Sequence, residues 1–340
     1  MSLKKMSDAA LNAWVDGLVA RTRVIGIQTK DDRFDFRPLR RASDLRLDYD
    51  VSLTPPNKAC FQPAEETLLR FQGAQFESVI ETEPFVLLGV HPYDVVAIAQ
   101  MDKIFAMDNA DTHYLARREA ATIVACDVQT VSENCYAGCM GAATVDEGFD
   151  VLLTRVGEGY LADARTDKGE ALLAGADAKN ATKADEAARE KVWKKNQAAL
   201  RKHDLKVSLK DVPALLAKSA AHPVWKERAE LCFSCGSCTN VCPTCYCFDV
   251  ADDVNWDLKS GRRKRAWDGC QLAKFARVAG GHNFRKDRAA RYRHRYYRKG
   301  MYVAEMIGQC ACVGCGRCIT ACVAKIANLP EVYNRLLEDK

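Results

Sequence analysis

Short apolar runs, separated by turns and by one helical pattern, occupy the first half of this 340-residue chain. Phe85–Val90 and Ala121–Cys126 have the length of buried strands, and Val95–Phe105 between them has a helix-like pattern. The run Asp150–Asp163, which turns at Gly157-Glu-Gly159, predicts a β-hairpin. This alternation of strand, helix and strand favours a layered, mixed α/β domain over residues 1–163.

Two further patterns complete the expected organisation. Pro63 followed by acidic residues is typical of a helix N-terminus, so we predict a helix over Pro63–Arg70. Residues 164–222 are rich in Ala, Lys, Glu and Asp, which predicts a helical connector. Residues 223–340 hold twelve of the sixteen cysteines and form a predicted C-terminal domain. The expected fold class is therefore α+β, with a mixed α/β domain, a helical connector and a cysteine-rich helical domain.

The cysteine content indicates a compartment and a chemistry. The first residues lack the apolar stretch and the cleavage site of a secretory leader, so we expect a reducing, cytoplasmic location. In that compartment closely spaced cysteines are more often metal ligands than partners in disulfide bonds. No stretch reaches the roughly 18 to 20 apolar residues of a membrane helix, and no membrane insertion is expected.

Eight cysteines form two runs of identical spacing, C-x2-C-x2-C-x3-C. In two-cluster ferredoxins the first three cysteines of such a run bind one [4Fe-4S] cluster, and the fourth binds the other cluster. We therefore predict a C-terminal ferredoxin-like domain with two [4Fe-4S] clusters. Cluster 1 would be bound by Cys232, Cys235, Cys238 and Cys322. Cluster 2 would be bound by Cys312, Cys315, Cys318 and Cys242.

Two other kinds of site fit these cysteines less well. Structural zinc normally uses two C-x2-C pairs separated by a longer loop, not four cysteines within eleven residues. A radical enzyme would use a C-x3-C-x2-C spacing, which Cys238, Cys242 and Cys245 also satisfy, but two of these three already belong to the ferredoxin pattern. Gly236 and Gly316 occupy matching places in the two runs, where a residue without Cβ permits positive φ.

About 70 residues separate Cys242 from Cys312, where small ferredoxins have a short link. The segments CFSCGSCTNVCPTCYCFDV, GRRKRAWDGCQ, VAGGHNFRKDRAARYRHRYYRKG and CVGCGRC resemble the β subunits of cytoplasmic sulfhydrogenase-type [NiFe] hydrogenases and the A subunit of anaerobic sulfite reductase. The segments LLGVHPYDVVAI, HYLARREAATIVAC and DEGFDVLLTRVGEGYL extend the resemblance to most of the chain. One departure is Tyr93-Asp94, where the family often has Cys-Asp.

The resemblance implies an electron-transfer subunit. Its neighbours would be a flavin- and NAD(P)-binding subunit and a catalytic subunit of hydrogenase, sulfite or sulfur reductase, or heterodisulfide-reductase type. The chain itself has no Gly-x-Gly-x-x-Gly loop for a dinucleotide and no set of catalytic residues for hydrolysis. We therefore expect no catalytic site in this chain.

The remaining cysteines leave alternatives open. Cys245, Cys247 and Cys270 lie in the segment between the runs and form a possible third cluster, or they are free thiols. The other group, Cys126, Cys135 and Cys139, either gathers near a metal or consists of buried thiols.

The segment between the runs is strongly basic, with fifteen Lys or Arg against two acids from Lys259 to Lys299. Aromatic residues are interleaved with these cations: Trp267, Phe275, Phe284, Tyr292, Tyr296 and Tyr297. Such a pattern is typical of nucleic-acid surfaces, so the alternative function is a nucleic-acid-binding protein with structural clusters. We favour compensation of negative cluster charge together with docking of a partner subunit, which makes nucleic acid an unlikely partner.

Overall fold

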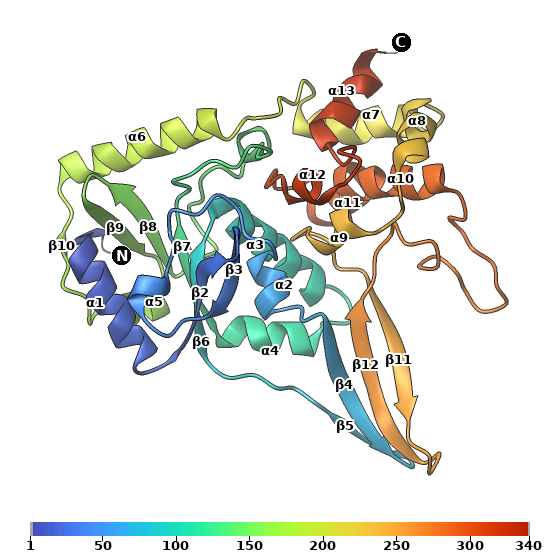
Figure 1. Cartoon of the computed structure of the whole chain (residues 1–340), viewed down its shortest axis with the longest axis horizontal. Helices are drawn as coiled ribbons and strands as arrows, with labels where there is room; N and C mark the ends of the chain where they lie inside the picture. Colours follow the sequence, from blue (N-terminus) through green and yellow to red (C-terminus); the bar gives the residue numbers. More distant parts are fainter. Residues whose placement is uncertain (1–2, 339–340) are drawn as a thin grey trace.

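The computed structural model describes residues 3–338. Residues 1–2 of the predicted domain 1–163 and residues 339–340 of the predicted domain 223–340 lie outside the described part. Within it, helices cover one large sheet, a smaller sheet projects to one side, and further helices gather near the C-terminus (Figure 1). The mixed α/β character predicted from the sequence is confirmed. No helix in residues 3–338 is both long and apolar enough to cross a bilayer.

The larger sheet has eight strands within the described residues, in the order β10-β1-β9-β8-β7-β6-β2-β3. Its central pairs β2–β6, β6–β7 and β7–β8 are parallel, and the other pairs are antiparallel. The strands are β1 (Leu3–Ser7), β2 (Arg23–Lys30), β3 (Arg33–Pro38), β6 (Phe85–Val90), β7 (Ala121–Cys126), β8 (Val151–Val156), β9 (Gly159–Ala164) and β10 (Lys179–Asn180). The two predicted strands are β6 and β7, and the predicted hairpin is β8 with β9, so these predictions are confirmed.

Helices α1, α3, α4, α5 and α6 pack against the strands of this sheet. The first six helices are α1 (Asp8–Val19), α2 (Pro56–Cys60), α3 (Pro92–Ala106), α4 (Thr112–Ala120), α5 (Asp167–Leu173) and α6 (Lys183–Ala199), with 3-10 turns at Ala42–Asp44 and Ala137–Cys139. The helix predicted over Val95–Phe105 is α3, which starts three residues earlier because Pro92 suits the first helical turn.

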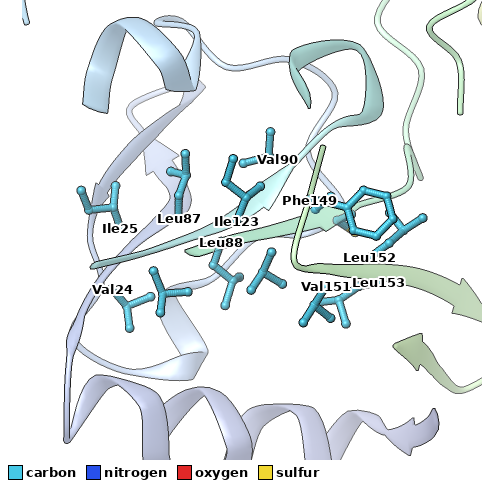
Figure 2. Packing of buried hydrophobic residues seen from close by; sticks show 14 of the residues in the cluster. Val24, Ile25, Leu87, Leu88, Val90, Ile123, Phe149, Val151, Leu152 and Leu153 are labelled. Carbon is cyan, nitrogen blue, oxygen red and sulfur yellow. The ribbon is translucent and has the colours of Figure 1, made fainter. Parts of the chain in front are cut away.

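The core of the sheet is built from strands that are apolar on both faces. In Figure 2 the side chains of Leu87 and Leu88 in β6 point to opposite faces, as successive residues of a strand must. All six residues of β6 are buried, as a parallel strand covered by helices on both faces requires.

The smaller sheet joins two distant parts of the sequence. It has four antiparallel strands in the order β11-β12-β4-β5. They are β4 (Glu65–Gln72), β5 (Gln75–Ser78), β11 (Phe248–Val254) and β12 (Ser260–Trp267). The predicted helix over Pro63–Arg70 is therefore wrong: β4 is held between β5 and β12, and pairing with a strand almost 200 residues later outweighs the local helix signal.

The C-terminal part is a group of short helices around an aromatic core. The helices are α7 (Val212–Lys218), α8 (Val224–Leu231), α9 (Ser237–Asn240), α10 (Arg288–Tyr297), α11 (Val303–Ile307), α12 (Arg317–Ala321) and α13 (Leu329–Glu338), with a 3-10 turn at Leu209–Asp211 and a π-helical turn at Arg298–Tyr302. Trp225, Tyr296 and Tyr333 are buried together in this core. Helix α10 packs against α8 and brings the basic segment into the core.

The predicted connector, residues 164–222, contains α5, α6 and α7 but also the short strand β10, which pairs with β1. Helix α6 lies along the larger sheet (Figure 1), where the indole Nε1 of Trp193 donates to Oδ2 of Asp127 at 2.8 Å. The domain boundaries at residues 163 and 222 remain a prediction. Contacts between α6 and β8, and between β4 and β12, cross them.

Candidate iron–sulfur centres

The two cysteine runs have the same local backbone. Ser234 and Gly236 in the first run have φ values of 54° and 78°, and Gly314 and Gly316 at the matching places of the second run have φ values of 70° and 78°. This left-handed region favours glycine. Gly236 and Gly316 directly precede α9 and α12, and these two short helices contact each other. The repeat in spacing is therefore also a repeat in structure.

Four cysteines line a first pocket, which we name the first cysteine pocket. They are the predicted ligands of cluster 1: Cys232, Cys235, Cys238 and Cys322. Three of them come from the first run, whereas Cys322 follows α12 of the second run. The wall includes the exposed side chains of Phe233 and Val323 and the buried guanidinium of Arg295. This pocket therefore lies at the surface of the described molecule.

Four other cysteines line a second pocket, the second cysteine pocket. They are the predicted ligands of cluster 2: Cys242, Cys312, Cys315 and Cys318. Tyr136, Arg295 and Lys299 line it as well. Each predicted ligand set thus lines one pocket, including the fourth cysteine that crosses from the other run. Which cysteine binds iron stays a prediction.

No three His, Cys, Asp or Glu side chains in residues 3–338 lie close enough together to hold one metal ion. The donors instead surround pockets with a cationic wall. Arg295 lines both pockets, is buried, and has no hydrogen-bond partner for its Nε and Nη1 atoms among the described residues. A buried guanidinium needs an anionic or hydrogen-bonding partner. Two thiolate-bound clusters, which are negatively charged, fit this arrangement.

One face of α10 and the following turn supplies three buried cations. Arg291, Arg295 and Lys299 are spaced four residues apart, so they lie on the same helical face. Nζ of Lys299 donates to Sγ of Cys242 at 3.2 Å, and Nη2 of Arg291 donates to Oγ of Ser234 at 3.1 Å. The cations therefore reach both cysteine runs.

These charges change the acidity of the groups around the pockets. The pKa of the Cys242 thiol is lowered by a hydrogen bond with Cys245 and further by the ammonium of Lys299, which favours the thiolate that binds iron. Burial lowers the pKa of the Arg295 guanidinium, but Cys238 and Cys318 raise it more, so the net pKa is above its usual value. Arg295 therefore keeps its charge beside the sulfurs.

The cations of β12 are paired with acids, most of them within the smaller sheet. Arg263 in β12 pairs with Asp252 in β11 at 2.7 Å, and Arg265 pairs with Glu66 in β4 at 2.6 Å. The aromatic residues of α10 are also occupied, because Tyr292, Tyr296 and Tyr297 are buried in the C-terminal core. These three rings cannot stack on bases. Arg295 and Lys299 line the cysteine pockets, whereas Lys274, Arg277 and Lys286 are exposed and pair with no acid among the described residues.

The loop between β7 and β8 covers the second cysteine pocket. The hydroxyl of Tyr136 lies 3.2 Å from Sγ of Cys312, and the backbone N–H of Tyr136 donates to the carbonyl of Gly314 at 2.7 Å. A Cβ at Gly316 would lie 2.3 Å from the carbonyl oxygen of Asn134. Glycine in the second run is therefore needed for this close approach as well as for its φ.

A buried ion pair between Arg317 and Asp94 also joins the second cysteine run to the N-terminal part of the chain. Nη1 and Nη2 of Arg317 donate to the two carboxylate oxygens of Asp94 at 2.6 and 2.7 Å, and Nη2 also donates to Oγ of Ser52 at 2.8 Å. Asp94 follows Tyr93, and both side chains are buried. This chain therefore has a carboxylate–arginine link between α3, which packs on the larger sheet, and the second run.

Sequence reasoning missed these supporting residues. The spacing of Arg291, Arg295 and Lys299 was a usable signal, since it repeats every four residues in a predicted helical region. Tyr136 and Asp94 gave no local signal, because each meets its cysteine run only after the chain has folded.

The two further cysteine groups named from the sequence lie apart from each other. Cys126 is buried in β7, where burial raises the pKa of its thiol to about 12. Cys135 is also buried with a pKa raised to about 12, and Sγ of Cys139 donates to the carbonyl of His203 at 3.4 Å. Cys245 and Cys247 line a third pocket at the root of the smaller sheet.

Residues 231–326 match the family of 4Fe-4S dicluster domains, and this interval contains all eight cysteines of the two runs. The chain therefore carries two [4Fe-4S] clusters and is an iron–sulfur protein of the electron-transfer class. Over most of its length it is also similar to sulfhydrogenase 2 subunit beta of Pyrococcus furiosus, with 33% identity over 321 residues that cover 93% of each protein. The chain belongs to this family of hydrogenase β subunits, which confirms the resemblance seen in the sequence motifs.

Proposed function

We propose that this chain is a non-catalytic, cytoplasmic subunit that relays single electrons through its two [4Fe-4S] clusters. The electrons pass between a flavin- and NAD(P)-binding subunit and a catalytic subunit of hydrogenase, sulfite or sulfur reductase, or heterodisulfide-reductase type. The observation that carries the proposal is Arg295, because one side chain lines both cysteine pockets and so makes the two clusters neighbours. The clusters perform the redox chemistry, and the protein supplies their spacing, their electrostatics and the exclusion of water.

In this relay Cys232, Cys235, Cys238 and Cys322 bind cluster 1, and Cys312, Cys315, Cys318 and Cys242 bind cluster 2. The lining of the two pockets supports this assignment. Buried Arg295 and Lys299 favour the reduced clusters, because reduction adds negative charge beside them.

Docking of partner subunits is supported by the surface beside the first cysteine pocket. Leu231, Phe233 and Val323 are large apolar side chains that stay exposed in the described chain. Such exposed groups beside an electron-transfer centre suit a protein interface. The printed name of the Pyrococcus furiosus relative, a subunit beta, supports the same view.

Removing one ligand of each cluster tests the relay. Cys238→Ala removes a ligand of cluster 1, and Cys315→Ala removes a ligand of cluster 2. Each variant is expected to lose one cluster and to stop electron flow from the flavin subunit to the terminal acceptor. The catalytic subunit should still work with an artificial electron donor that bypasses the relay.

The control is Cys60→Ala, which removes a cysteine outside both pockets. Electron flow that is unchanged in the two ligand variants would refute the relay. Filter binding to DNA and RNA addresses the alternative function, since binding that is strong at low salt and falls steeply as salt rises would indicate phosphate contacts.

A further inference from the structure

Three cysteines outside the two ligand sets meet at the root of the smaller sheet. Cys245 and Cys247 line a pocket together with residues of α2, α3, β4, β11 and β12. Cys270 is buried, and its loop meets Cys247, because the backbone N–H of Asp268 donates to the carbonyl of Cys247 at 3.0 Å. The chain between the two runs thus brings three thiols to one place, although Cys270 is more than 20 residues further on.

A buried cation lines the same pocket. Lys58 of α2 is only 2% exposed, and its Nζ lies 4.4 Å from the centroid of the Trp267 ring. Within residues 3–338 the side chain of Lys58 forms no ion pair and no hydrogen bond, and its contact is with the Trp267 ring. A buried ammonium without a carboxylate is costly unless an anion occupies the space in front of it.

The other charged groups of this pocket are already matched. Glu66 pairs with Arg265 at 2.6 Å and with Arg117 at 2.8 Å. Phe105 and Phe248 give the pocket apolar walls. The cysteines and Lys58 are therefore the groups of this pocket that are free to bind a ligand. Together they favour an anionic ligand that is bound by thiolates.

We propose that Cys245, Cys247 and Cys270 bind a third iron–sulfur cluster of the [4Fe-4S] type, with Lys58 as its counter-charge. Three thiolates hold three irons, and a ligand other than cysteine completes the fourth. The site lies beside cluster 2, because Cys245 follows the proposed cluster 2 ligand Cys242 by three residues and its backbone N–H donates to the carbonyl of Cys242 at 3.2 Å. This inference goes beyond the two-cluster relay, which it extends toward the smaller sheet.

Iron content decides the proposal. The full-length chain is reconstituted with iron and sulfide under anaerobic conditions, and iron and acid-labile sulfide are measured per chain. Three clusters give about twelve iron atoms per chain, and two clusters give about eight. A value of about eight would overturn the third cluster and leave the two-cluster relay intact, so the two proposals fail separately.

Matched variants assign the extra iron. Cys247→Ser and Cys270→Ser should each lower the iron content by about one third and the number of electron spins in the reduced protein by the same fraction. Cys60→Ser, which removes a cysteine on the same helix as Lys58 but outside the pocket, should retain all the iron. Twelve iron atoms in both ligand variants would place the extra iron elsewhere and refute this site.

Lys58→Met tests the counter-charge without removing a ligand. The iron content should stay at the wild-type value, while the third cluster becomes harder to reduce because a buried positive charge is gone. In a redox titration followed by electron paramagnetic resonance, one third of the spins should move to lower potential. Unchanged titration of all spins would show that Lys58 faces no cluster. A misfolded cysteine variant would not affect this test or the wild-type iron count.

Discussion

Asp94→Asn removes one charge from the buried pair that links α3 to the second cysteine run. The side chains of Arg317 and Asp94 are 2% and 0% exposed, so water cannot replace the lost carboxylate. Arg317 lies between Cys315 and Cys318 in the sequence, and the substitution therefore acts directly beside the second cysteine pocket. We expect it to destabilise the native protein and to hasten the loss of cluster 2.

The magnitude follows from what Arg317 retains. Breaking one side of a buried ion pair costs about 3–5 kcal/mol, mostly from the uncompensated charge that remains. Arg317 still donates to the carbonyl and hydroxyl of Ser52 at 2.9 and 2.8 Å, and the amide oxygen of an Asn still accepts one bond. The cost should therefore lie near the lower limit, about 3 kcal/mol.

Unfolding rates measure this cost, since a protein that loses clusters does not refold reversibly. If the pair is absent from the transition state, about 3 kcal/mol corresponds to unfolding up to about 150-fold faster. The assay follows circular dichroism and iron–sulfur absorbance in urea under anaerobic conditions.

The matched control is Asp48→Asn. Asp48 forms a two-bond pair with Arg46 at 3.1 and 3.0 Å, but these side chains are 57% and 45% exposed. An exposed pair contributes less than about 1 kcal/mol, so this variant should unfold less than about fivefold faster. Equal rates for the two variants would refute the reasoning that burial makes the Asp94 pair strong.

Three other predictions test separate features. Burial raises the pKa of Asp127 to about 6. The protonated carboxyl therefore makes its full contribution to the free energy of unfolding below about pH 4, and this contribution is lost as the pH rises through about 6. Asp127→Asn should therefore gain up to about 3 kcal/mol relative to wild type between pH 4 and 7, and parallel pH profiles of unfolding would contradict this. Arg295→Met should make both clusters harder to reduce in a redox titration, because Arg295 lines both pockets. The control is Arg293→Met, which should leave the potentials unchanged because Arg293 donates to a backbone carbonyl. Equal potentials in the two variants would argue against Arg295 as the shared counter-charge. Gly316→Ala should lower the denaturation temperature more than Gly141→Ala, because both glycines have positive φ but only the Cβ at residue 316 would meet backbone atoms. Equal shifts in the two variants would mean that positive φ alone accounts for the loss of stability.

The sequence predicts a strand well when the signal lies within the strand itself. β6, β7, β8 and β9 are apolar runs bounded by turns, and all four lie where the pattern indicates. β4 is different, since Glu65–Gln72 has a local helix signal and becomes a strand by pairing with β12. No local pattern contains that partner, because it comes from the segment between the two cysteine runs.

Charge shows the same limit. The sequence has an excess of cations from Lys259 to Lys299. Acids outside that segment pair with the cations of β12 and neutralise their charge. Only the fold separates these paired cations from Arg291, Arg295 and Lys299, which are buried beside the cysteine runs. The count alone therefore predicts a uniformly basic surface, whereas the fold divides the cations into paired, buried and exposed groups.

The two cysteine pockets differ because only one of them is covered by the N-terminal part of the chain. Tyr136, Asp94 and the loop around Asn134 lie against the second run, whose Cys315 and Cys318 are buried. No such cover lies over the first run among the described residues, where Cys235 and Phe233 are exposed. Identical spacing thus leads to unequal surroundings, and a cluster in the buried pocket is shielded from water while one in the open pocket can approach a partner. The difference comes from residues that are distant in sequence, which is why the repeated motif alone does not reveal it.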